Sequence, residues 1–124
     1  MASCGRGNWR MVKQGDIIWL DFDPQTGHEQ SGRRPALVIS NNVFHWHSTT
    51  MAMVCPITKT KHKFAYRISL GETTQIQGHV MCDQAKILDL SSRNPQFIES
   101  APSSILKEAV DIVFGIIYIG ENEQ

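Results

Sequence analysis

The sequence predicts a small antiparallel β-barrel that is followed by a single C-terminal helix. Short apolar segments, separated by polar and turn-forming residues, occupy most of the chain before residue 100. No long segment of helical periodicity separates them, and helical spacing is found only after them. Strands in series without intervening helices favour an antiparallel barrel. The length of 124 residues fits one domain.

The first two predicted strands flank a loop. Asp16–Phe22 (DIIWLDF) is an almost continuous apolar run, which is typical of a strand buried on both faces. The loop at 23–32 contains a proline and two glycines. Pro35–Ser40 (PALVIS) is the second strand, and its opening proline favours an extended backbone at Arg34. We expect Asn41–Thr50 to form a loop or a short helix.

Three further segments are predicted to be extended. Met51–Ile57 (MAMVCPI) is apolar, and Gly78–Leu90 has the composition of one strand or a pair of strands. Phe64–Leu70 alternates between apolar and polar residues, which predicts a half-exposed strand. Its apolar face would carry Phe64, Tyr66, Ile68 and Leu70.

The last segment has helical periodicity. Apolar residues recur at a spacing of three and four, at Ile105, Leu106, Ala109, Val110, Ile112, Val113, Ile116 and Ile117. Pro102 lies just inside the predicted start of this helix and Gly120 just past its end, as helix boundaries prefer. We expect residues 1–14 to be a loose N-terminal extension, residues 15–120 to form the domain, and residues 121–124 to be a tail.

Overall charge does not point to a class of partner. The chain has 12 basic and 12 acidic residues, so any case for nucleic acid must come from local charge. The N-terminus lacks the apolar segment of a secretory signal. The apolar stretch Ile105–Ile119 is interrupted by Lys107, Glu108 and Asp111 and is too short to span a bilayer. We therefore expect a soluble cytoplasmic protein that makes no membrane contact.

Positive charge gathers in two places. The first is the pair Arg33–Arg34, and the second is a stretch without acids that contains Lys59, Lys61, Lys63 and Arg67. Two basic loops beside a barrel could hold a phosphate backbone. The alternative is that the second stretch is a solvated hairpin with ordinary lysines.

Arg34 is a candidate anion ligand. Its planar guanidinium suits bidentate phosphate contact, and the proline that follows restricts its backbone. The alternative is a structural ion pair with Glu29. Glu29 could likewise be a general base or only the partner of that pair.

The histidines and cysteines do not predict a metal site. His45 and His47 are two residues apart, while His28, His62 and His79 are scattered. No cysteine or acid completes a zinc set with the usual spacing, so we expect exposed loop histidines, no metal and no cofactor. Cys4, Cys55 and Cys82 contain no CxxC pair. Cys55 lies in an apolar run and is predicted to be a small core residue.

Several motifs resemble one known family. GDIIWLDFDPQTGHEQSGRRPALVIS, at residues 15–40, resembles the opening of the MazF/PemK toxins, the ribonuclease components of bacterial toxin–antitoxin systems. The resemblance continues through VCPITK at 54–59 and HVMCDQAKILDL at 79–90. With the terminal helix it covers residues 15–119 in family order. It implies an SH3-like barrel of the CcdB/MazF toxin fold, a homodimer, and metal-independent cleavage of single-stranded RNA.

The resemblance also assigns roles to residues. The arginine of the RP pair corresponds to Arg34 and the family threonine to Thr58, and both are expected to be catalytic. Glu29 is an alternative general base. The remaining expected RNA-binding residues are Gln30, Arg33, Asn41, Lys59, Lys61, Asp83 and Gln84.

The implied reaction is attack of the ribose 2′-OH on the adjacent phosphorus. It would leave a 2′,3′-cyclic phosphate and a 5′-hydroxyl, with Arg34 stabilising the charge on the phosphorane. Unpaired bases would be read on the barrel rim. An acidic, partly disordered, MazE-like antitoxin would cover the same groove and fold on binding.

Three alternatives share parts of this evidence. A CcdB-like toxin that binds DNA gyrase would have the same fold, but a Trp near the end of the terminal helix is absent here, since no Trp follows Trp46. An SH3-like peptide-binding module would leave the RP and PIT motifs unexplained. An inactive family member is disfavoured because Arg34 and Thr58 are both present.

Overall fold

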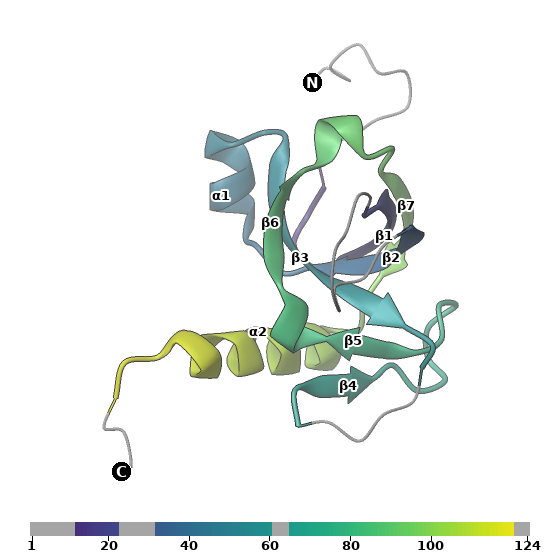
Figure 1. The fold of residues 1–124 in the computed structure, drawn as a ribbon, viewed down its shortest axis with the longest axis vertical. Helices are drawn as coiled ribbons and strands as arrows, with labels where there is room; N and C mark the ends of the chain where they lie inside the picture. The colour runs from purple at the N-terminus through teal and green to yellow at the C-terminus, as the bar shows by residue number, and fades with distance from the viewer. Residues whose placement is uncertain (1–11, 23–31, 61–64, 121–124) are drawn as a thin grey trace.

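The computed structural model describes residues 12–22, 32–60 and 65–120 (Figure 1). Within these ranges it contains strands, two α-helices and two 3-10 turns. In chain order they are β1 (Asp16–Asp21), β2 (Arg33–Val38), α1 (Asn42–His47), β3 (Met51–Thr58), β4 (Arg67–Ser69), β5 (His79–Met81), η1 (Cys82–Gln84), β6 (Lys86–Asp89), η2 (Leu90–Ser92), β7 (Gln96–Ser100) and α2 (Ser103–Ile117).

The strands form one strongly bent antiparallel sheet. Its order is β4-β5-β3-β2-β1-β7, and β6 also pairs with β3. Figure 1 shows β1, β2, β3, β6 and β7 arranged around a ring, with α2 and the β4–β5 pair beneath it. Among the described residues β4, β6 and β7 each pair with a single neighbour, so hydrogen bonds do not close the barrel. The predicted mainly β fold with a C-terminal helix is confirmed.

Two apolar clusters lie on the two faces of the central strands. Ile18, Ala36 and Val54 belong to one cluster, whereas Ile17 and Leu37 belong to the other. β1 is therefore buried on both faces, as its continuous apolar run predicted. Burying a side chain of this size stabilises the fold by about 1.5–3 kcal/mol. The second cluster includes the buried residue of α2, Ala109, so the helix covers one face of the sheet.

The N-terminal part of β2 differs from the prediction. The strand begins at Arg33, so Pro35 is its third residue and not its first. Pro35 pairs with Trp19 of β1, but the β2–β3 register begins only at Ala36. Among the described residues no strand pairs with that edge of β2 beside Pro35, which is where a residue without an N–H is tolerated.

Several other boundaries were only partly predicted. Asn41 caps a short helix, and the segment 78–90 divides into β5 and β6, two outcomes that the sequence allowed. β4 is shorter than predicted, and the Tyr66 side chain, 44% exposed, does not share the buried face of Ile68 and Leu70. The remaining residue of that expected face, Phe64, lies outside the described residues. β7 was not predicted.

The ends of the chain also differ from expectation. Val12 is buried in the first cluster, so residues 12–14 are not loose. Pro102 is the N-cap of α2, and the helix ends at Ile117, before Gly120. Ile116 and Ile117 were expected on the buried stripe, but they are exposed because the helix extends past the sheet at this end. No helix in the described part of the chain is both long and apolar enough to cross a membrane.

Candidate nucleic-acid groove

A cavity of about 500 Å³ lies where β2 begins and β3 ends. The loop between β4 and β5 forms its third wall. The lining combines cations, hydroxyls, carboxamides and one indole. These residues are Trp19, Arg33, Arg34, Pro35, Ile57, Thr58, Lys59, Thr60, Gln75, Ile76 and Gln77.

The strand register places the two predicted catalytic residues together. Ala36 pairs with Pro56, and Arg34 and Thr58 each lie two residues beyond that pair, at the same end of the two antiparallel strands. Both residues line the cavity. Thr58 is 5% exposed, and its Oγ1 accepts a hydrogen bond from the backbone N–H of Thr60 at 3.1 Å. Its hydroxyl is thus oriented by the chain and can donate its own proton to a phosphate oxygen.

Arg33 has a protein partner that the sequence interpretation did not include. Because β1 and β2 are antiparallel, Arg33 pairs with Asp21, and Nη1 lies 3.0 Å from the carboxylate oxygen Oδ1. A hydrogen bond from Asn94, followed by one from Arg33, lowers the pKa of Asp21, so its carboxylate remains charged at neutral pH. Arg33 therefore lines the groove with part of its charge offset.

The rim of the cavity is basic. Lys59 and Thr60 follow β3 and are exposed, and Arg34 is half-buried. No carboxylate lines the cavity among the residues described here. This local excess of cations favours an anionic ligand even though the chain as a whole is neutral.

Three groove residues were not predicted from the sequence. Trp19 was read only as part of a buried strand, but it is half-buried and lines the cavity. An indole there offers a stacking surface for a base. Gln75 and Gln77 lie in a turn-rich segment (GETTQIQG) to which we assigned no function. Their lack of periodicity gave no signal, because it is the antiparallel pairing of β5 with β3 that brings this loop to β3.

Several predicted RNA-binding residues are located elsewhere. Asn41 accepts a hydrogen bond from the N–H of Phe44 and caps α1, away from the cavity lining. Asp83 and Gln84 form part of η1, where an Asp83 oxygen lies 3.9 Å from Nε of Arg67. Glu29, Gln30 and Lys61 lie outside the described residues, so their roles stay predictions.

The predicted loop histidine at 45 is in fact buried. His45 lies on α1, and its Nε2 is 2.6 Å from Oγ of Ser40. Because burial lowers its pKa, the imidazole is neutral at neutral pH. Within the described ranges no group of three or more His, Cys, Asp or Glu residues is arranged to hold a metal ion.

Cys55 is a core residue, as predicted. It is fully buried, and a hydrogen bond with Cys82 together with burial raises the pKa of its thiol. The thiol is therefore protonated at neutral pH and packs as a small apolar side chain.

The fold and the groove define a class of protein. A small bent antiparallel sheet presents cations, a threonine and an indole at its strand ends, which suits binding of an anionic chain with flat bases. The chain belongs to the family of PemK-like, MazF-like toxins of type II toxin–antitoxin systems, whose sequence model matches residues 13–113.

Individual relatives agree with this assignment. The chain is 32% identical over 104 residues to the endoribonuclease PemK of Escherichia coli, a match that covers 80% of this chain and 77% of PemK. It is 35% identical over 103 residues to the endoribonuclease toxin ChpB of E. coli K12, covering 79% and 87% of the two chains. These relatives do not favour the gyrase-binding alternative.

Solved structures show the same fold. MazF of Deinococcus radiodurans superposes with a TM-score of 0.82 at 31% identity, over 89% of this chain and 99% of the other. A chain of a MazE–MazF complex from the same organism superposes with a TM-score of 0.77 at 31% identity, over 90% and 99%.

Proposed function

We propose that this toxin is a sequence-specific endoribonuclease that cleaves single-stranded RNA in the groove of Arg34 and Thr58. The observation that carries the proposal is that the cation and the hydroxyl expected to act on a phosphate line one cavity. The chain's relatives PemK and ChpB are both endoribonucleases. Cleavage of mRNA would stop translation and growth, and the site of action would be the cytoplasm.

The proposed reaction is an internal transfer of the phosphodiester. The 2′-oxygen forms a bond to phosphorus, the bond from phosphorus to the 5′-oxygen breaks, and a proton moves from the nucleophile to the leaving group. Arg34 stabilises the negative charge that develops on the nonbridging oxygens, because a guanidinium stays charged and can donate two hydrogen bonds. Thr58 positions one of those oxygens. The products are a 2′,3′-cyclic phosphate and a 5′-hydroxyl, and no metal ion takes part.

Recognition of sequence would come from the rest of the groove. Trp19 can stack on an unpaired base, and the carboxamides on the loop wall can bond to base edges. Lys59 attracts the phosphate backbone, and so does Arg33, although Asp21 offsets part of its charge. Gln30, Lys61 and the alternative base Glu29 belong to the same proposal through the family resemblance.

The antitoxin partner is proposed to be an acidic, MazE-like chain that covers this groove. The solved MazE–MazF complexes of D. radiodurans contain a toxin chain of the same fold. A groove with basic residues at its rim and no carboxylate in its described lining is complementary to acidic side chains. We expect the complex to weaken steeply as salt rises, and affinity that is equal at low and high salt would contradict charge mimicry.

We also propose that the toxin is a homodimer. Large apolar side chains are exposed at the end of α2 and just after it, namely Phe114, Ile116, Ile117, Tyr118 and Ile119. Exposure of such a contiguous apolar group favours burial against a second copy. In sedimentation experiments the wild type should have the mass of a dimer and Ile117→Lys the mass of a monomer. An equal mass for the two proteins would exclude this surface as the dimer interface.

The test of the enzymatic proposal is cleavage of a long single-stranded RNA by the purified toxin in excess EDTA. We expect discrete cuts with 5′-hydroxyl and cyclic phosphate ends, and no cuts in DNA of the same sequence. The matched control is an RNA in which only the nucleotide before the mapped cut lacks its 2′-OH. Cleavage of that control, or no cleavage of any varied RNA, would contradict the mechanism.

A further inference from the structure

A carboxylate on β7 holds the loop that forms one wall of the groove. Oε1 of Glu99 accepts a hydrogen bond from the backbone N–H of Gln75 at 3.0 Å, and Oε2 accepts one from the N–H of Ile76 at 2.9 Å. The two oxygens of one side chain thus bind two consecutive amides. Such a charged, two-point contact fixes both the position and the orientation of the loop relative to the sheet.

The loop is also braced internally. Oγ1 of Thr74 donates a hydrogen bond to the carbonyl of Ile76 at 2.6 Å, and Nε2 of Gln77 donates one to the carbonyl of Thr74 at 3.0 Å. These bonds make the turn at 74–77 compact. Glu99 then ties the compact turn to β7, so the turn and the sheet are positioned as one unit.

An irregularity in β7 places Glu99 for this contact. Glu99 pairs with Ile17, whereas Phe97 pairs with the next residue, Ile18, so the register shifts between them. A β-bulge of this kind bends a strand and redirects a side chain. Glu99 is half-buried beside the loop and does not line the cavity itself.

The far end of the loop lies against a predicted catalytic residue. Gly78 has φ of +132°, and a Cβ on it would be 2.4 Å from the carbonyl oxygen of Thr58. Thr58 also pairs with His79 in β5. The loop that Glu99 holds therefore ends beside Thr58, at the edge of the groove.

We propose that Glu99 is a positioning residue for RNA recognition, which holds the loop 74–77 so that the Gln75 carboxamide meets an unpaired base. The proposal rests on the proposed RNA cleavage in this groove. A role through charge alone makes the opposite prediction. A carboxylate near a phosphate-binding groove repels RNA, so its removal would tighten binding if repulsion were its main effect.

The experiment compares the full-length wild type with Glu99→Ala, Glu99→Gln and the control Glu72→Ala, which removes an exposed carboxylate from the same connection. For Glu99→Ala we expect KM to rise about tenfold while kcat stays within about twofold, because ordering of substrate is lost but the reacting groups remain. The cut-site map on a long RNA should gain sites. Glu99→Gln keeps one acceptor oxygen and should be intermediate, and Glu72→Ala should match the wild type.

A second variant separates recognition from stability. Gln75→Ala leaves the backbone N–H that Glu99 binds, so it should change the cut-site map in the same direction while the urea midpoint stays constant. Unchanged KM and cut sites in both variants, or a lowered KM in Glu99→Ala, would overturn the role of Glu99 and leave the proposed RNA cleavage intact. If the wild type cuts no RNA, the proposed function fails and the inference fails with it.

Discussion

Two hollows on this small molecule show how a neutral chain separates its charges. The groove at the strand ends is lined by Arg33, Arg34 and Lys59, with no carboxylate in its described lining. The second hollow, of about 360 Å³, lies along α2 and is lined by two carboxylates and one lysine, together with Ser104 and Ile112.

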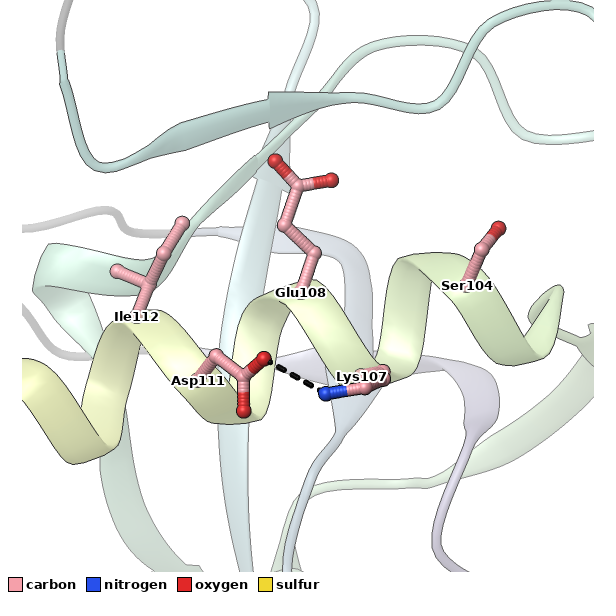
Figure 2. Close-up of a pocket in the computed structure, with 5 residues that line it drawn as sticks. All are labelled: Ser104, Lys107, Glu108, Asp111 and Ile112. Carbon is pink, nitrogen blue, oxygen red and sulfur yellow. Dashed lines mark hydrogen bonds and ion pairs between the residues drawn. The ribbon is translucent and has the colours of Figure 1, made fainter.

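The single cation of the α2 hollow is already engaged. Figure 2 shows Lys107 directed at Asp111, with 3.0 Å between Nζ and Oδ2, while Glu108 points away from this pair. A phosphate entering there would meet carboxylates first. The two hollows differ in their lining, because of the two only the groove has cations next to a hydroxyl and an indole.

The largest effect expected is on the chemistry of the groove. Arg34→Ala removes the donor that stabilises the phosphorane, so the rate of RNA cleavage should fall about a hundred- to a thousandfold. The matched control is Lys107→Ala, which removes a cation from the other hollow and should leave the rate unchanged. Initial rates under single-turnover conditions measure both. Equal rates for wild type and Arg34→Ala would exclude Arg34 as the cation that stabilises the phosphorane.

The next effect concerns the backbone beneath the groove. Gly78→Ala places a Cβ against the Thr58 carbonyl at a φ that other residues rarely adopt, which should cost on the order of 1–3 kcal/mol of unfolding free energy. Cleavage should fall as well, since Thr58 must shift. Urea denaturation measures the first effect, and Gly115→Ala is the control, because nothing lies within 4 Å of a Cβ at that helical position. Equal midpoints for the two variants would show that the loop does not press on β3.

These sites also show what the sequence could predict. The mainly β fold and the apolar β1 followed from local patterns, and the family motifs singled out Arg34 and Thr58, which line one cavity. Such patterns can be recognised from the sequence because apolar periodicity and turn-forming residues are local features of the chain. The loop at 74–77, its tie to Glu99 and the strand β7 were not predicted. Their contacts join residues more than twenty positions apart, and no periodicity in either segment reports them.

Acidification should lower the stability of the fold through His45, which lies on α1 and does not line the groove. Burial lowers the pKa of His45 from its ordinary 6.5, so below that pH the unfolded chain binds a proton that the folded chain excludes. Stability should therefore decrease as pH falls from 6.5 towards the lowered pKa of folded His45.

The measurement is the urea midpoint at pH 7 and pH 5 for the wild type and for His45→Gln. The variant starts less stable, because its contact with Ser40 is altered, but its midpoint should depend less on pH. Exposed His47 and half-buried His79 are common to both proteins, so they cancel in the comparison. An equal pH dependence in the two proteins would exclude His45 as the source.

The smallest effect belongs to the α2 hollow. The Lys107–Asp111 pair is exposed on both sides, at 77% and 64% of the side-chain area, and it joins residues one helical turn apart. Pairs of this kind contribute about 0.3–0.5 kcal/mol in water, so Asp111→Ala should lower the unfolding free energy by no more than that. The same change leaves Lys107 without its partner and makes the hollow less acidic. If the RNA affinity of Asp111→Ala at low salt is then higher than that of the wild type, the α2 hollow has become an RNA site through its charge alone, and the two hollows differ only in net charge. If it is unchanged, the arrangement of Arg34, Thr58 and Trp19 makes the difference, because charge without that geometry does not create a site.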